Sequence, residues 1–344
     1  MKIRTALLLI LIILIVLPHG GLSQAQDPVD EVIRVDSDLT SLLFTAMDKD
    51  NRFMTSLQES DIQLTEDSAV QKIQSFQRET DRPLSLAFLI DVSASEERTL
   101  PQEKAAARAF IETVLKSNKD QGAILAFTGA TFLEQGLTRD VLSLYRALER
   151  VDVAMPAYPG GGRVINGMSS GPGLRRPPPE GTTAMWEAVV LTVEQVLAVN
   201  AAKEKLSPKR RAIILLSDGW DTSSRLNGQE AVKAALAEET IIYAIGIGDS
   251  KREGIDKHSL ETIAEQTGGR AFFPKKDADL TSAFAEIEKE LRTQYLITYS
   301  STNKRRDGSF RQMRLWITNP QLQKAKVQLR YRPGYYARPV STGN

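Results

Sequence analysis

The stretch Leu84-Ser-Leu-Ala-Phe-Leu-Ile-Asp-Val-Ser-Ala-Ser95 decides how the rest of the chain is interpreted. Its first part, Leu84–Ile90, is apolar apart from one serine, which is typical of a strand buried on both faces of a parallel sheet. Asp91, Ser93 and Ser95 follow at a spacing of two residues. Ligands of open α/β sheets bind beyond the carboxyl ends of the strands. The three oxygen-bearing side chains are therefore predicted to lie at a ligand site.

These oxygen donors suit a hard divalent cation. Mg2+ takes about six oxygen ligands and usually keeps several waters, so one carboxylate and two hydroxyls supply half a shell. The alternative is a strand followed by a polar turn, because Asp and Ser are common turn formers. Two later segments favour the cation: Gly181-Thr182-Thr183 opens a predicted helix, and the apolar strand Ile213–Leu216 is followed by Ser217-Asp218-Gly219.

The order of these segments resembles the von Willebrand factor type A domain. In that family, a metal-ion-dependent adhesion site combines Asp-x-Ser-x-Ser after the first strand, a loop Thr, and an Asp after the fourth strand. The resemblance implies a site for Mg2+ or Mn2+ whose residues, in chain order, are Asp91, Ser93, Ser95, Thr183 and Asp218.

The resemblance also implies a role for each of these side chains. Ser93 and Ser95 would bind the metal directly, and Thr183 would bind it directly or through water. Asp91 and Asp218 would mostly hold the metal's waters and the hydroxyls in place. The dication would then keep unneutralised charge and one open position, which a carboxylate of a partner protein could fill. The expected function is metal-mediated adhesion to an exposed Asp or Glu of a protein ligand.

Two other functions stay open at this point. One is a hydrolase that uses the same metal as a Lewis acid. The other is an envelope scaffold in which the metal only stabilises the fold. The expectation is that the protein is not an enzyme, because no general base is found near the predicted site.

Composition restricts the catalytic alternatives further. The chain has no Cys and two His, His19 and His258. Cys–His catalysis and a zinc site with several His or Cys ligands are therefore excluded. A haloacid-type phosphatase needs a second Asp where this chain has Ser93. The formal net charge of +1 gives no indication of nucleic acid as a partner.

Residues 1–25 have the pattern of a secretory signal peptide. Lys2 and Arg4 are followed by the 12 apolar residues Ala6–Leu17 and by Ser23-Gln24-Ala25, a small-x-small cleavage pattern. The apolar run is short for a bilayer span, which needs about 20 residues. The expected location is the periplasm, cell envelope or exterior, with no stable membrane span after cleavage. A retained anchor is the alternative.

From residue 83 to residue 292, predicted strands and helices alternate. This predicts a doubly wound, mostly parallel sheet flanked by helices, and the type A resemblance covers the same range. The segment Met155–Gly181 interrupts the pattern with seven Gly and six Pro. It is predicted to form no regular element, and to be either disordered or part of the rim of the site. Helices are predicted over 100–116, 139–151, 183–199, 227–239, 258–266 and 280–292.

Short strands are predicted on both sides of this region, over 26–80 and over 293–338. Neither set is large enough to fold alone. The simplest arrangement is one β-sandwich-like module, with the type A domain inserted between its halves and with residues 339–344 as a tail. This layout resembles a bacterial family of exported type A-related proteins, which the Asp307-Gly308 hairpin and the ending Tyr331–Tyr336 also match.

Overall fold

The computed structural model describes residues 39–79, 82–115, 118–154, 159–165, 182–199, 209–248 and 254–339. The predicted signal peptide, residues 1–25, lies outside these ranges, as do residues 155–158 and 166–181 of the glycine- and proline-rich segment. All described residues belong to one compact unit. No helix among them is both long and apolar enough to cross a membrane.

A seven-stranded sheet forms the centre of the α/β part. Its order is β11-β10-β9-β5-β6-β7-β8. Neighbours from β11 to β6 run parallel, whereas β7 and β8 are antiparallel. This confirms the predicted mostly parallel sheet. The strands are β5 (Leu84–Asp91), β6 (Gln121–Phe127), β7 (Thr131–Thr138), β8 (Arg163–Ile165), β9 (Arg210–Ser217), β10 (Thr240–Gly246) and β11 (Ala271–Phe272).

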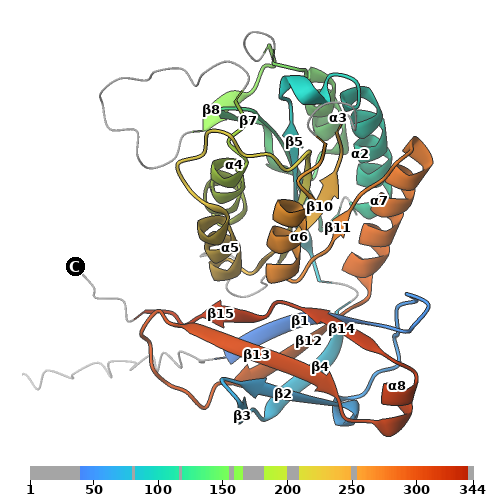
Figure 1. Ribbon diagram of the computed structural model, residues 1–344, viewed down its shortest axis with the longest axis vertical. Coiled ribbons are helices and arrows are strands. Elements are labelled where there is room, and N and C mark those ends of the chain that lie inside the picture. Colours follow the sequence, from blue (N-terminus) through green and yellow to red (C-terminus); the bar gives the residue numbers. More distant parts are fainter. Residues whose placement is uncertain are drawn as a thin grey trace, which may run out of the picture. The chain divides into compact units, whose positions relative to one another are not determined.

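Helices cover both faces of this sheet, as Figure 1 shows. Every residue of β5 is buried, and its side chains alternate between two cores. Leu86 and Phe88 pack on one face with α2, α3 and α7, whereas Ala87 and Leu89 pack on the other with α4, α5 and α6. A strand buried on both faces must be continuously apolar, which explains the Leu84–Ile90 run. The helices are α2 (Leu100–Val114), α3 (Val141–Arg150), α4 (Met185–Thr192), α5 (Gly228–Ala237), α6 (Lys257–Gln266) and α7 (Asp277–Arg292).

Two predicted features of the α/β part are wrong. The helix predicted over residues 183–199 begins at Met185 and continues after Thr192 as a π-helical turn, Val193–Leu197, so Thr183 lies in the preceding loop. The segment predicted to be irregular contains β8, which pairs with β7. Ile165 of β8 is buried in the core beside α4. Three residues suffice for an edge strand, and neighbouring glycines and prolines do not prevent one.

The strands before and after the α/β part pair with one another, as predicted. One sheet has the order β14-β1-β12-β4, and the other has the order β15-β13-β2-β3. The two sheets enclose a shared core that includes Leu42, Leu64 and Ile297. The elements are β1 (Leu39–Met47), a 3-10 turn (Glu59–Asp61), β2 (Ile62–Glu66), β3 (Ala69–Val70), β4 (Ile73–Glu79), β12 (Gln294–Ser300), β13 (Phe310–Ile317), α8 (Pro320–Lys324), β14 (Gln328–Tyr331) and β15 (Gly334–Tyr336).

The segment Ala69–Glu79 contains two strands, β3 and β4, which belong to different sheets. The apolar positions of this segment do not alternate because the chain changes sheets within it. Gln71 lies at the crossing, where its side chain accepts a hydrogen bond from the Thr302 backbone N–H at 3.0 Å.

Glu66 joins the two sheets inside the module. Its carboxylate is buried, with 1% of the residue exposed. It accepts hydrogen bonds from the Tyr299 hydroxyl at 2.7 Å and from the Tyr335 hydroxyl at 3.0 Å. Ser301 Oγ donates to its other oxygen. A buried carboxylate with three donors is well satisfied, so the network holds N-terminal and C-terminal strands in one arrangement.

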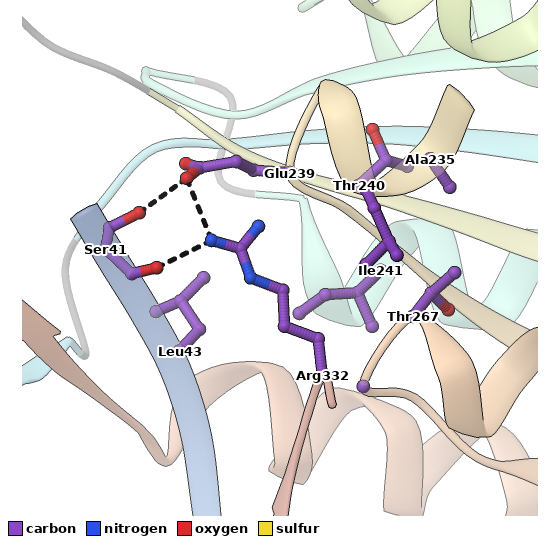
Figure 2. Close-up of a pocket in the computed structure, with 10 residues that line it drawn as sticks. Ser41, Leu43, Ala235, Glu239, Thr240, Ile241, Thr267 and Arg332 are labelled. Carbon is purple, nitrogen blue, oxygen red and sulfur yellow. Dashed lines mark hydrogen bonds and ion pairs between the residues drawn. The ribbon is translucent and has the colours of Figure 1, made fainter. Parts of the chain in front are cut away.

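A second polar contact lies where the strands of the module meet residues that follow α5 (Figure 2). Arg332 donates to the Ser41 backbone oxygen at 2.6 Å and to Glu239 Oε1 at 3.1 Å. Ser41 Oγ donates to the same Glu239 oxygen at 2.7 Å. Glu239 thus receives one donor from β1 and one from the residue after β14. These three residues line a small pocket with Leu43 and Ile241.

We expect removal of residues 295–344 to make the remaining chain aggregate. Among the described strands, β1 pairs with β12 and β14, and β4 pairs with β12, so truncation would expose the apolar face of Leu42 and Phe44. A fragment of residues 84–292, which keeps the seven-stranded sheet and its helices, should stay soluble and monomeric. Size-exclusion chromatography of both fragments tests the proposed boundaries of the two parts. Equal solubility of the 26–294 fragment and the 26–344 chain would show that the strand sets are independent.

Glu66→Gln should lower the free energy of unfolding by about 1–3 kcal/mol, because its amide would direct N–H groups at hydroxyls that now donate. Urea denaturation of the full chain measures the change. Glu59→Gln, a substitution at an exposed residue of the 3-10 turn, is the matched control and should have little effect. An unchanged unfolding midpoint in Glu66→Gln would contradict the role assigned to the network.

Candidate metal site

The candidate site lies at the point where the strand order reverses. From β5 the chain builds the sheet outward through β6, β7 and β8, then returns to the other side of β5 with β9, β10 and β11. β5 and β9 are parallel neighbours, with Ile90 opposite Leu216. Their carboxyl ends therefore meet at one edge, which is the usual ligand position of an open α/β sheet.

Asp91 is the buried centre of this edge, with 0% of the residue exposed. Its Oδ1 accepts a hydrogen bond from the Ser93 backbone N–H at 3.0 Å. Its Oδ2 accepts one from Ser217 Oγ at 2.7 Å. Ser217 Oγ also accepts a hydrogen bond from the Gly219 backbone N–H at 3.0 Å. Ser217 therefore links the end of β9 to Asp91, a role that its position beside Asp218 did not reveal.

The two serine hydroxyls lie together on the turn after β5. Ser93 Oγ and Ser95 Oγ are 3.0 Å apart. The turn is closed by a 3-10 turn, Ala94–Glu96, and is anchored by a hydrogen bond from the Val92 backbone N–H to the Phe127 backbone oxygen at 2.9 Å. This places both hydroxyls at the carboxyl end of the sheet, as predicted.

Thr183 is held at the same edge by residues that follow the strands β6 and β9. Its backbone N–H donates to Thr222 Oγ1 at 2.8 Å, and its backbone oxygen accepts from the Thr222 N–H at 2.9 Å. On the other side, Thr128 Oγ1 donates to the Thr182 oxygen at 2.8 Å, and the Ala184 N–H donates to the Thr128 oxygen at 2.8 Å. The loop that carries Thr183 is thus fixed between the segments that follow β6 and β9.

Asp218 lies in a tight turn that only glycine permits at the next position. Gly219 has a φ of 89°, and a Cβ there would lie 2.6 Å from the Asp256 backbone oxygen. The Asp256 N–H donates to the Asp218 backbone oxygen at 2.8 Å. The side chain of Asp218 accepts from the Trp220 N–H at 3.1 Å. The turn therefore brings a second, largely buried carboxylate to the edge.

A third carboxylate, which the sequence did not suggest, belongs to Glu96. Among the described residues, Asp91, Glu96 and Asp218 form a group in which one oxygen of each lies within 4.8 Å of the others. All three residues are buried. The only sequence signal was an acidic residue directly after Ser95, at a position where the resemblance assigns no role.

Burial raises the pKa of these groups. Burial, together with the negative charge of Asp218, raises the pKa of Asp91 to about 7 despite the hydrogen bonds from Ser93 and Ser217. The pKa values of Glu96 and of Glu103, a buried carboxylate on α2, are also raised, mainly by burial. Charged carboxylates are costly in this environment unless a cation neutralises them.

The donors fit a hard divalent cation. They are carboxylate and hydroxyl oxygens without nitrogen or sulfur, which is the set that Mg2+, Ca2+ or Mn2+ accepts. The spacing of the carboxylate oxygens allows one ion to be shared, and Glu96 Oε1 is buried without a hydrogen-bond partner. Ser93, Ser95 and Thr183 supply hydroxyls at the same edge.

Two neighbouring polar residues have other roles. Asp221 Oδ2 accepts a hydrogen bond from the Trp186 backbone N–H at 3.0 Å, so it caps the start of α4. His258 lies in the first turn of α6 and is exposed. It lines a groove between α4, α5 and α6, together with Trp186 and Thr262.

Residues 174–287 match the family model described as the von Willebrand factor type A domain. The match includes Thr183 and Asp218 and ends before α7 is complete, whereas Asp91, Ser93 and Ser95 lie outside it. A comparison with curated proteins finds no match to the chain.

Solved structures with similar folds include three type A or related proteins. Proximal thread matrix protein 1 from the mussel byssus, in a form with a zinc-occupied MIDAS motif, is 16% identical with a TM-score of 0.48 and covers 65% of this chain. BatB from Bacteroides thetaiotaomicron is 18% identical with a TM-score of 0.43; the match covers 62% of this chain and 100% of BatB. A von Willebrand factor type A protein from Catenulispora acidiphila is 12% identical with a TM-score of 0.47; here 88% of this chain and 73% of that chain are covered.

The chain spans about half the length of the mussel protein, 49%. The matched residues 174–287 contain the strands β9, β10 and β11 and the helices α4, α5 and α6 of one face. These strands share a sheet with β5 and β6. Residues 174–287 of the α/β part are therefore similar to the von Willebrand factor type A domain, in agreement with the resemblance found in the sequence.

Proposed function

We propose that the protein is an exported adhesion module that binds an acidic protein ligand through a divalent metal ion. The metal, Mg2+ or Mn2+, would be held at the edge where β5 and β9 end. The observation that supports this most is the meeting of two buried carboxylates with the Ser93–Ser95 hydroxyl pair at the topological switch point. The residues proposed to hold it are Asp91, Ser93, Ser95, Thr183 and Asp218.

The residues of the site would contribute to metal binding in different ways. Ser93 and Ser95 present two hydroxyl oxygens on a turn that the Asp91–Ser93 hydrogen bond keeps closed. Asp91 and Asp218 supply the negative charge that attracts a dication into a buried site. Thr222 and Thr128 hold the Thr183 loop in place from both sides. When bound, the metal would offer a coordination position to an Asp or Glu of the partner.

Binding is favoured over catalysis by the residues near the site. Type A domains are typically protein-interaction modules. In the described part of the chain, the side chains that hydrogen-bond to Asp91 and Glu96 are the hydroxyls of Ser217 and Thr99. His258 is on α6 with its side chain exposed. A metal-dependent hydrolase and a scaffold with a stabilising metal remain the alternatives that the experiments below must separate. Export rests on the signal-peptide pattern of residues 1–25.

Ser93→Ala and Asp218→Asn should each weaken Mg2+ binding at least tenfold, about 1.4 kcal/mol, because each removes an oxygen donor or charge from the shell. Isothermal titration calorimetry on the mature chain measures the affinity. Ser143→Ala is the matched control, since Ser143 lies in the first turn of α3, which begins near the opposite edge of the sheet, where Thr138 pairs with Gly122. Wild-type Mg2+ affinity in both site variants would contradict the site assignment.

Metal removal should release the partner. Beads that carry the mature protein, incubated with envelope extract in Mg2+, should retain an acidic protein that EDTA elutes and that Asp91→Ala beads do not retain. Capture that survives EDTA, with a melting temperature that EDTA lowers, would favour the scaffold. Mg2+-dependent turnover of phosphoester or peptide substrates, lost in Asp91→Ala, would favour the hydrolase.

A further inference from the structure

Glu96 is a buried carboxylate at the proposed metal site with no structural explanation. The residue has 0% of its surface exposed. Its Oε2 accepts a hydrogen bond from Thr99 Oγ1 at 2.8 Å, whereas Oε1 has no partner. One Glu96 oxygen lies within 4.8 Å of oxygens of both Asp91 and Asp218.

No cationic side chain of the described residues neutralises this carboxylate. No Lys or Arg of the described residues pairs with Glu96, and the group behind it is another acid, Glu103. Glu103 is 1% exposed, and neither of its oxygens has a hydrogen-bond partner. An unpaired buried carboxylate with a free oxygen is expensive, whereas a structural carboxylate is normally surrounded by donors, as Glu66 is. The free oxygen of Glu96 therefore points to a missing cation.

We propose that Glu96 is a built-in ligand of the same metal ion, and that it occupies the coordination position that a partner's carboxylate would take. This inference rests on the proposed metal site. Oxygens of one Mg2+ shell lie up to about 4.2 Å apart and those of one Ca2+ shell up to about 5.2 Å apart, so three oxygens within 4.8 Å of one another can reach one ion after a small side-chain shift.

The net charge of the metal site determines how Glu96 would affect the binding of a partner's carboxylate. Asp91 and Asp218 alone would balance a dication, and a third carboxylate makes the occupied site negative overall. A negative site attracts an external carboxylate less, so a partner's Asp or Glu must displace Glu96 before it can bind. In the absence of a partner, Glu96 would thus be a ligand of the metal. The affinity of the protein for acidic ligands would then be lower than that of a variant without Glu96.

The test uses Mn2+ as the metal and acetate as the carboxylate probe, on the mature chain. Free Mn2+ is counted by electron paramagnetic resonance, and waters on bound Mn2+ are followed by water-proton relaxation. Glu96→Gln should weaken Mn2+ binding at least tenfold and raise the relaxation enhancement per bound Mn2+, because water replaces a carboxylate oxygen. Millimolar acetate should then lower that enhancement in Glu96→Gln but leave it unchanged in the wild type.

Glu97→Gln is the matched control, because Glu97 is the next residue and is exposed. It should behave as the wild type in all three measurements. If Glu96→Gln does not fold, judged by its thermal melt without metal, Glu96→Met supplies an apolar side chain of similar length for the same measurements.

The possible outcomes separate the two proposals. Wild-type Mn2+ affinity and relaxation in the Glu96 variants, with binding lost in Ser93→Ala, would overturn the role of Glu96 and leave the metal site standing. Absence of Mn2+ binding in the wild type, or binding unaffected by Ser93→Ala, would overturn the metal site and with it this inference. Weaker binding with more bound water in Glu96→Gln alone supports both.

Discussion

The hydrogen bond from Ser217 to Asp91 is the contact on which the candidate site depends. It joins the last residue of β9 to the last residue of β5, two neighbours that come from distant parts of the chain. Because the strands are parallel and their register is fixed by the sheet, the two residues can meet only at the carboxyl edge. Ser217 also accepts a hydrogen bond from Gly219, so the turn that carries Asp218 is set by the same hydroxyl. One oxygen thus organises both carboxylates.

Sequence reasoning found the parts of the molecule that have strong local signals. The apolar run Leu84–Ile90 could only be a strand buried on both faces, and the oxygen-bearing residues after it had to lie at its carboxyl end. The pairing of the terminal strand sets followed from the small size of each set. These arguments needed no knowledge of which side chains touch.

Features that depend on tertiary contacts could not be read in this way. β8 has one buried side chain, Ile165, in a segment dominated by glycine and proline, so no periodicity marks it. The start of α4 moved past Thr183 because Thr222 and Thr128 hold that loop in a non-helical conformation. Glu96 could not be singled out, since nothing in the local pattern shows that the 3-10 turn directs it inward while its neighbour Glu97 stays exposed.

The pairing of β1 with β12 has a consequence for the order in which the chain folds. Leu39 begins β1 and Gln294 begins β12, so the first strand waits for a partner 255 residues later in the chain. At a synthesis rate of about 5–20 residues per second, that interval is roughly 13–50 s. All strands and helices of the α/β part are made within it, so this part can fold first. The terminal strands must then close around a finished neighbour, as the slow, long-range step of folding.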